Sequence, residues 1–268
     1  MIRATILGCG SSGGVPRLDG HWGDCDPANP KNRRRRCALL VQRIGAQGTT
    51  QIVIDTGPDF APQMLDAGIS ELDAVVYTHA HADHIHGIDD IRQLVFNRGA
   101  VMPIWADGTT AEALVTRFGY IFETPPGSLY PPVCALNLIE GPLTIHGAGG
   151  TLHLTPFVVE HGAIMALGFR IRGEDARGLV YLPDVSAIPD AAWPAIMGAD
   201  LFICDALRRT PHPSHAHLAR TLDWFSRAGT PRCVITNMHL DMDYAAVMAD
   251  TPAHVVPAFD GMVVEVAG

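Results

Sequence analysis

The sequence predicts an α/β protein in which two β-sheets pack face to face and helices cover their outer faces. Runs typical of strands are followed by runs typical of helices, and the second half of the chain repeats this style. Elements of this kind bury their apolar faces against each other in layers. The chain has 268 residues, of which 47% are hydrophobic and 18% charged, so we expect one domain over residues 1–268.

In the first half, short apolar runs predict strands at residues 3–8, 37–43, 51–57, 73–78 and 103–107. Residues 60–69 and 109–119 have helical spacing. A further helix is expected over residues 86–99, where Ile88, Ile91, Leu94 and Val95 share one face and Gly99 is placed to end it.

The second half repeats the pattern with more strands. We expect strands at residues 143–147, 152–161, 167–173, 178–184, 201–205, 233–239 and 254–266. Helices are expected at residues 191–198 and 217–229.

Composition argues against several classes of protein. The chain has no apolar run of about 18 residues, which a transmembrane helix needs, and its start lacks the features of a signal peptide. The six scattered cysteines fit reduced, structural thiols. We therefore expect a cytoplasmic protein without a membrane partner. The formal net charge of −9 argues against a surface for extended nucleic acid.

Three histidines and an aspartate follow the expected strand at residues 73–78, in the stretch HAHADH. Residues at i and i+2 share a face only in an extended chain, so His79 and His81 converge on one metal ion only if this stretch is extended. Asp83 and His84 come as the chain turns toward a helix and can be aimed elsewhere. Imidazole and carboxylate groups this close together favour a metal site over a solvated loop, and suit two neighbouring ions better than one.

HAHADH matches the H-x-H-x-D-H signature of the metallo-β-lactamase superfamily, which the chain resembles. The resemblance implies a four-layer αβ/βα sandwich, with two mixed sheets flanked by helices and the metal ions at one edge. It also implies three later ligands after strands, which are His161 in FVVEHG, Asp184 in GLVYLPD and His239 in CVITNMH.

The same resemblance assigns these residues to two divalent ions. It implies that one ion is held by His79, His81 and His161, and a second by Asp83, His84 and His239, with Asp184 between them. Nitrogen and oxygen ligands without thiolate suit Zn, Mn or Fe, and the sequence does not choose among these metals.

LGCGSSGGVPR resembles a glycine-rich strand-to-loop opening that the cyclic-phosphodiesterase and tRNA 3′-endonuclease branches of the superfamily share. Two later stretches, DALRRTPHPSHAHLARTL and VVPAFDGMVVEV, resemble the phosphoribosyl 1,2-cyclic phosphate phosphodiesterase branch. In that branch, a histidine at the position of His215 opens a helix near the metals. The branch also carries a structural zinc site, built from a cysteine cluster and a histidine three residues after the last metal ligand. Here the region offers only Cys25 and distant Cys37, and Met242 stands three residues after His239, so we expect this zinc site to be absent.

Other polar residues fit either a functional or a structural role. Asp55 either orients a ligand imidazole or forms a turn, and His86 either faces the substrate or lies in solvent. The run from Arg33 to Arg36 is either a solvated loop or a contact for phosphate. The glycine-rich stretch from Ser11 to Gly14 either offers N–H groups to an anion or forms a tight turn.

The sequence thus predicts a dinuclear metal hydrolase that cleaves a small phosphodiester, either a cyclic phosphate or a nucleotide-like one. Two metal ions supply a hydroxide near neutral pH, and a histidine protonates the leaving alkoxide. The expected catalytic residues are His215 and Asp83. His212 and His217 either assist His215 or are polar residues at a helix start.

Competing functions give different expectations. A tRNA 3′-processing endonuclease of the same fold needs a long basic arm, which this acidic chain does not show. A β-lactamase needs an export signal, and a non-catalytic metal-binding accessory protein has no need of His215. The sequence leaves the oligomeric state open, with a homodimer among the expectations.

Overall fold

The computed structural model describes residues 1–124, 126–174 and 177–267, and these form two seven-stranded sheets. The strands of the first sheet, in spatial order, are β14 (Met262–Val266), β1 (Ile2–Gly8), β2 (Ala38–Gly45), β3 (Gly48–Ile54), β4 (Ala74–Val76), β5 (Met102–Ala106) and β6 (Cys134–Leu138). Strands β3 to β6 run parallel, and the other pairs are antiparallel.

The second sheet contains, in spatial order, β13 (Val255–Pro257), β12 (Cys233–Thr236), β11 (Leu201–Asp205), β10 (Leu179–Leu182), β9 (Ile164–Arg172), β8 (Leu152–His161) and β7 (Leu143–Ile145). Strands β10 to β13 run parallel. Both sheets are therefore mixed, as predicted.

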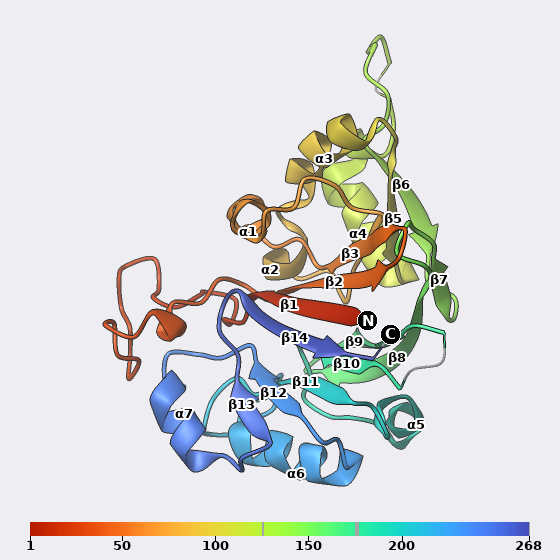
Figure 1. Cartoon of the computed structure of the whole chain (residues 1–268). Helices are drawn as coiled ribbons and strands as arrows, with labels where there is room; N and C mark the ends of the chain where they lie inside the picture. The colour runs from red at the N-terminus through yellow and green to blue at the C-terminus, as the bar shows by residue number, and fades with distance from the viewer. Residues whose placement is uncertain (125, 175–176, 268) are drawn as a thin grey trace.

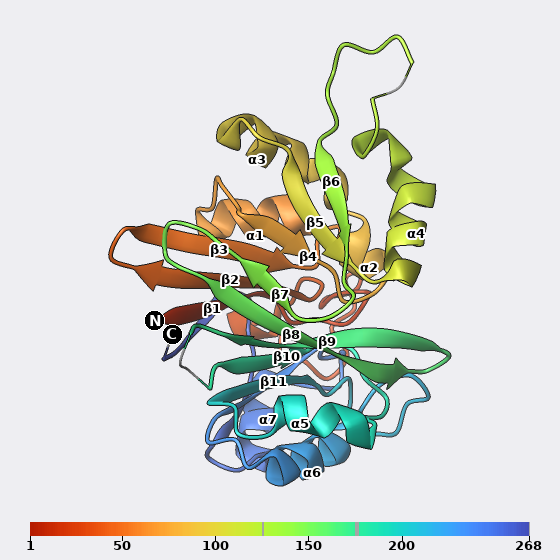
Figure 2. The same ribbon diagram turned by 90° about the vertical axis from the view of Figure 1, so that its right-hand side faces the viewer.

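Helices cover the outer faces of the two sheets. They are α1 (Phe60–Ala67), α2 (Ala82–Ile85), α3 (Ile91–Arg98), α4 (Gly108–Phe118), α5 (Trp193–Ile196), α6 (Leu218–Ala228) and α7 (Tyr244–Asp250), with 3-10 turns η1 (Pro30–Asn32), η2 (Ile88–Asp90), η3 (Gly119–Ile121) and η4 (Asp190–Ala192). Figures 1 and 2 show α1, α3 and α4 outside the first sheet and α5 to α7 outside the second. This order of layers confirms the predicted αβ/βα sandwich.

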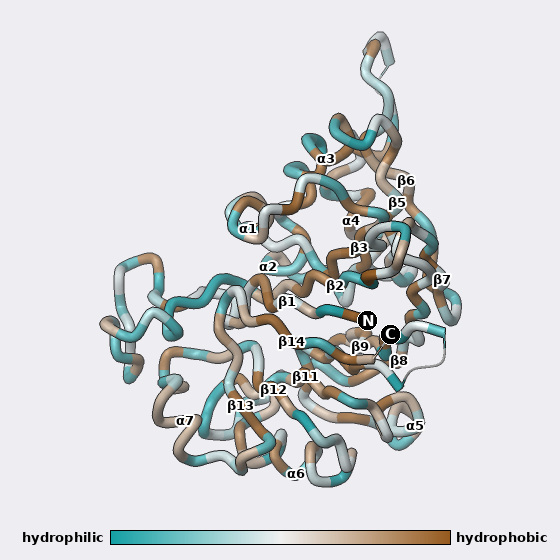
Figure 3. Tube along the Cα trace, in the orientation of Figure 1, coloured by the Kyte–Doolittle hydropathy of each residue, from teal (hydrophilic) through white to brown (hydrophobic). Residues whose placement is uncertain are grey.

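Alternating side chains divide the core into layers. In β2, Leu39 and Val41 pack with the residues between the two sheets, whereas Ala38 and Leu40 pack with the residues under the first layer of helices. Successive side chains of a strand point to opposite faces, so one strand serves both cores. Figure 3 shows hydrophobic segments concentrated along strands and hydrophilic ones on the protruding loop at the left.

Among the described residues, no helix combines the length and the hydropathy that crossing a membrane requires.

The structure differs from the predicted elements in a few places. Strand β6 and helix α7 were not predicted. The expected helix over residues 86–99 begins as the 3-10 turn η2 and continues as α3, and the Gly87 N–H before it donates to Thr56 O at 2.8 Å. The apolar run at residues 254–266 becomes two strands in different sheets, β13 and β14.

Candidate metal centre

The candidate site lies at the edge where strands of both sheets end. His79 follows β4, and His161 ends β8. Asp184 follows β10, and Asn237 follows the parallel strand β12. Residues at the carboxyl ends of parallel strands meet at one edge of a sheet, so this topology gathers side chains that are distant in sequence.

The HAHADH stretch has the local conformation that a shared ion requires. His81 has extended backbone angles, φ −66° and ψ 150°, and it directly precedes α2. His79 and His81 therefore leave an extended segment, while Asp83 and His84 belong to the single turn of α2. The donor atoms of His79, His81 and His161 all lie within 4.8 Å of one another.

Hydrogen bonds orient three of the histidine rings. The Thr78 hydroxyl donates to Asp55, so its lone pair is free to accept from His79 Nδ1 at 3.0 Å. His161 Nδ1 donates to Ser214 O at 2.7 Å. Both rings thereby present Nε2 as a lone pair, which is the usual arrangement for a metal-ligating histidine. Burial lowers the pKa of His79 well below its usual value, so this ring is neutral.

Asp55 holds the third of these rings, that of His84. Its Oδ2 lies 2.8 Å from His84 Nδ1, and its Oδ1 accepts from the Thr78 backbone N–H at 2.8 Å. Asp55 is fully buried and has a left-handed φ of 66°, which is uncommon outside glycine. These contacts favour the orienting role for Asp55 over a simple turn.

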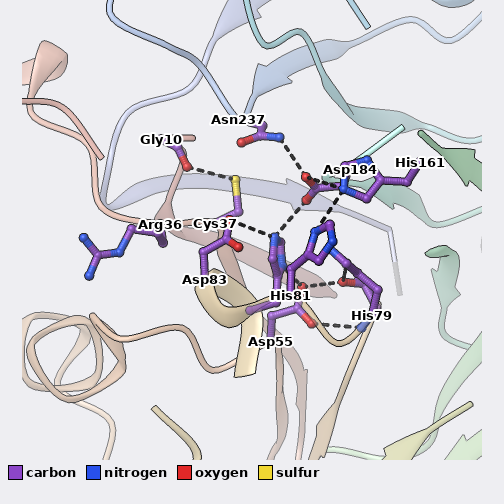
Figure 4. A network of polar contacts seen from close by, with 12 residues as sticks. Gly10, Arg36, Cys37, Asp55, His79, His81, Asp83, His161, Asp184 and Asn237 are labelled. Atoms are coloured by element: carbon purple, nitrogen blue, oxygen red, sulfur yellow. Dashed lines mark hydrogen bonds and ion pairs between the residues drawn. The ribbon is translucent and has the colours of Figure 1, made fainter. Parts of the chain in front are cut away.

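A second group of donors surrounds His84. Its Nε2 lies 2.9 Å from Asp184 Oδ2 and 3.5 Å from Asp83 Oδ2. Burial alone would lower the pKa of His84, but Asp184, Asp55 and Asp83 raise it well above its usual value. Figure 4 shows Asp184 between His161 and the rings that come from the other sheet. So much buried negative charge draws a cation, either a proton or a metal ion.

The residues fit a metal centre. His79 Nε2 is buried without a hydrogen-bond partner, and His161 Nε2 lies 3.1 Å from His81 Nδ1. Donors bound to one tetrahedral Zn²⁺ at about 2.0–2.1 Å lie roughly 3.3 Å apart. The separations around Asp184, from 2.9 to 3.8 Å, bracket that value. Cys37 lies beside the site (Figure 4), but among the described residues the groups of three close donors contain only imidazole nitrogens and carboxylate oxygens.

Sequence reasoning missed Asp205, the partner of His215. Asp205 ends β11 next to the strand that carries Asp184, and its Oδ2 lies 2.9 Å from His215 Nδ1. Burial would lower the pKa of His215, but Asp205 and then Asp184 raise it to about 9. An aspartate at the end of a fully apolar strand, LFICD, was the signal that could have revealed it.

His239 does not join the cluster, contrary to what the resemblance implied. Among the described residues, no group of three close donors includes His239 or Asp83, although Asp83 Oδ2 lies 3.5 Å from His84 Nε2. The side chain of His239 is 33% exposed, and its Nδ1 lies 3.4 Å from Asp241 Oδ1. Asn237 lies at the cluster instead, with its Nδ2 3.1 Å from Asp184 Oδ1. The ligand role of His239 therefore has no support in the geometry.

Three arginines of the basic run at residues 33–36 make contacts within the protein. Arg34 is buried and donates to Met242 O at 2.6 Å, while Arg35 pairs with Asp66 and Arg36 with Asp59. These contacts favour a structural role over the phosphate contact that the sequence also allowed.

Two features lie at the rim of the cluster. A hollow of about 570 Å³ adjoins His81 and is lined by Ala80, His81, Ala82, His86, Arg117 and Phe118. On another side, burial together with the charge of Arg17 lowers the pKa of His239, and Arg208 adds to this effect. Cationic side chains thus stand near His239, at the rim of the cluster.

A family model described as "Beta-lactamase superfamily domain" matches residues 50–238. The chain belongs to this superfamily, and its sandwich is the metallo-β-lactamase fold. A solved structure of a diphosphatase from the PhnP family has 33% identity and a TM-score of 0.85, with 98% of this chain and 96% of that chain covered. The chain therefore falls in the PhnP branch, which confirms the family that the motifs predicted.

Curated relatives are more varied in name. An octanoyltransferase of Porphyromonas gingivalis is 29% identical over 97% of this chain and 51% of its own length. A ribonuclease Z of Bradyrhizobium diazoefficiens is 31% identical over 60% of this chain and 52% of its own. The chain thus spans about half the length of these relatives. Family and neighbours together support a metal-dependent hydrolase.

Proposed function

We propose that this protein is a dinuclear metal hydrolase that cleaves a small phosphodiester, either a cyclic phosphate or a nucleotide-like compound. The related PhnP-family protein is described as a diphosphatase. A diphosphate with two organic groups resembles a diester, because each phosphorus carries two bridging oxygens, although one of them is an anhydride oxygen. Two bound divalent ions would supply a hydroxide nucleophile and polarise the phosphoryl oxygens. His79, His81, His161 and Asp184 would hold one ion, and Asp83, His84 and Asp184 the other.

The pair formed by His215 and Asp205 is the observation that carries this proposal. The carboxylate of Asp205 accepts from His215 Nδ1–H, so Nε2 is the atom left to give a proton to a leaving group. The His215 ring centroid lies 4.6 Å from that of His161, which puts the acid beside the candidate ligands.

The rim residues fit a small anionic substrate with an organic group. Arg17 and Arg208 stand near His239 and offer positive charge to a phosphate. The hollow beside His81 contains the Phe118 ring and has room for a nucleobase or a similar ring. Beyond this rim, a chain with formal net charge −9 repels long polyanions, so small diesters are favoured over RNA.

A substrate panel tests the proposal. Protein loaded with Mn²⁺ or Zn²⁺ is assayed on a phosphoribosyl 1,2-cyclic phosphate, 2′,3′-cyclic nucleotides, a dinucleoside diphosphate, a nitrophenyl phosphodiester, precursor tRNA, a thioester and a lactam. We expect at least one small phosphodiester to be cleaved with the highest kcat/KM, and His215→Ala to abolish most of that activity while metal content stays the same. Faster cleavage of precursor tRNA, the thioester or the lactam would refute the proposal.

We also propose a native metal and a location for this protein. We infer Zn²⁺ or Mn²⁺ from the donor set, with Fe as a further candidate. All six cysteines are free and buried, which is compatible with the reducing cytoplasm. The homodimer stays a prediction.

A further inference from the structure

We infer that His212 is a second substrate-binding imidazole, whose Nε2–H binds a neutral oxygen of the leaving group beside the oxygen that His215 protonates. This inference rests on the hydrolase proposed above and narrows its substrate, because the leaving group must then carry a hydroxyl or ether oxygen, as a sugar does. The ring of His215 contacts two other imidazoles. Its centroid lies 4.6 Å from that of the candidate ligand His161 and 5.3 Å from that of the partly exposed His212.

The loop that carries His212 is held in one shape. A β-bridge between Arg208 and His217 closes the loop at its base. Pro211 and Pro213 flank the histidine, and a proline fixes its own φ and restricts the residue before it to extended conformations. The side chain of Arg208 donates to Pro211 O at 3.0 Å. These restraints position the imidazole of His212 before a substrate arrives.

Ser214 connects His212 to the candidate ligand His161. Its carbonyl accepts from His161 Nδ1 at 2.7 Å, and its N–H donates to His212 Nδ1 at 3.3 Å. The turn after His161 fits closely against this serine, because a Cβ on Gly162 would lie 2.7 Å from Ser214 Cβ. Gly162 also has a left-handed φ of 62°. The loop therefore packs against the end of β8, which holds His212 close to the candidate ligands.

The contact with Ser214 assigns the proton of the His212 ring to one nitrogen. A backbone N–H can only donate, so Nδ1 is the acceptor and the hydrogen of the neutral ring lies on Nε2. Burial lowers the pKa of His212, and the positive charges of His215 and Arg208 lower it further. Among the described residues, none accepts a hydrogen bond from Nε2. This atom is therefore an oriented and uncharged donor that a ligand can use.

The two neighbouring imidazoles suit two different oxygens. The carboxylates of Asp205 and Asp184 raise the pKa of His215 to about 9, so this ring is charged and can give up a proton. His212 is uncharged and keeps its proton. Hydrogen bonds from charged donors to phosphate are stronger than those from neutral ones, so the metal ions and the arginines of the rim hold the phosphate. The neutral donor is then left for a neutral acceptor on the same leaving group.

Binding of ribose 5-phosphate and of methyl phosphate to the Zn²⁺-loaded chain tests the inference without turnover. Both ligands carry a phosphate ester, but only the sugar adds hydroxyl and ether oxygens. The wild type should bind ribose 5-phosphate more tightly than methyl phosphate. His212→Ala should weaken the binding of ribose 5-phosphate by about 2- to 12-fold, the range for a hydrogen bond between uncharged groups, and leave that of methyl phosphate unchanged. Calorimetry measures both affinities, and thermal melting checks that each variant folds.

Two conservative variants separate this role from a structural one. Glutamine places its side-chain nitrogen where Nε2 of the imidazole stands, so His212→Gln should keep most of the affinity for ribose 5-phosphate. Asparagine reaches only as far as Nδ1, so His212→Asn keeps an acceptor for Ser214 and should behave like His212→Ala. The matched control is His217→Gln, which should change neither affinity, because His217 belongs to the same loop but is the N-cap residue of α6.

The position of the proton can be measured by nitrogen NMR of the Zn²⁺-loaded chain. At about pH 7, His212 should be neutral with its proton on Nε2, and its signals are those missing in His212→Gln. A proton on Nδ1, a charged ring, full affinity in His212→Asn, or a wild type that does not prefer ribose 5-phosphate would overturn the inference.

The inference and the proposed function can fail separately. If ribose 5-phosphate binds as expected but no phosphodiester is cleaved, the proposed function fails while the binding role of His212 stands. If a diester with a sugar leaving group is cleaved and His212→Ala leaves its kcat/KM unchanged, the inference fails and the proposed function stands.

Discussion

Replacing Asp205 by asparagine tests whether His215 is oriented for proton transfer. Asp205 Oδ2 lies 2.9 Å from His215 Nδ1, and the carboxylate is fully buried. A hydrogen bond to a charged group contributes about 1.5–3 kcal/mol, and each 1.36 kcal/mol corresponds to a factor of ten in rate. If this bond acts in the transition state, Asp205→Asn should lower kcat on a diester with an alkoxide leaving group by about 10- to 150-fold.

The assay compares two leaving groups at saturating metal. A nitrophenolate leaving group needs little protonation, so its loss in Asp205→Asn should be much smaller than the loss with an alkoxide. His215→Ala should lose at least as much as Asp205→Asn, and the double variant should lose no more than His215→Ala, because Asp205 acts through His215. Equal losses on both leaving groups would refute the general-acid role. Loss of bound metal would reassign the pair to structure.

Three further outcomes are expected. If a nucleobase stacks on the Phe118 ring, Phe118→Leu should lower kcat/KM for nucleotide substrates by about 5- to 150-fold. The kcat/KM for a diester without a ring should stay the same, because leucine keeps the side chain apolar. Equal losses of kcat/KM for both substrates would contradict stacking on Phe118. Arg34→Ala should lower the free energy of unfolding by about 1.5–3 kcal/mol, because the buried guanidinium of Arg34 donates to Met242 O. The side chain of Arg35 is partly exposed, so Arg35→Ala should lower it by under about 1 kcal/mol, and equal losses for the two variants in chemical denaturation would contradict this. Burial raises the pKa of Asp260 to about 7. The stability that its protonation contributes is therefore full at low pH and lost as pH rises through about 7, and the melting temperature of Asp260→Asn should depend less on pH between 5 and 8 than that of the wild type. Melting temperatures that fall equally with pH in both proteins would contradict this.

The layers of the fold were predictable because they follow from local patterns. Consecutive apolar residues in CALLVQR mark a strand buried on both faces, and helix α1 ends at Gly68, whose left-handed φ of 65° fits the glycine stop seen in the sequence. The pairing of strands was not readable in the same way. The run at residues 254–266 looks continuous, yet β13 joins the second sheet and β14 the first. Nothing in apolar periodicity tells to which sheet a short strand belongs.

The candidate site was predictable where its residues are dense in sequence and less so where they are scattered. HAHADH revealed four donors at once, because three imidazoles and a carboxylate within six positions are uncommon outside metal sites. Near β12, the resemblance pointed to the histidine at hand, His239, but the side chain that enters the centre is fixed by the backbone turn at Asn237. Asp205 was overlooked because a single aspartate at a strand end is common, and its pairing with His215 depends on a loop that brings the two together.

The distribution of charge explains how an acidic chain can serve an anionic substrate. Four carboxylates lie at or beside the centre, those of Asp55, Asp184 and Asp205 buried and that of Asp83 partly so, and therefore part of the formal charge of −9 faces inward. Two bound dications would offset these four negative charges, and the ions would then be the largest local charges that a phosphate meets. The outer surface remains acidic and is screened only beyond about 8–10 Å at physiological salt. A substrate with one or two phosphates fits within that distance of the ions, whereas each further phosphate of a long polyanion would lie against repelling charge. Because salt screens this repulsion, added salt should lower the KM of a long polyanion relative to that of a small diester. A KM of the polyanion that rises with salt would instead show that a basic path along the surface, not the centre, selects the substrate.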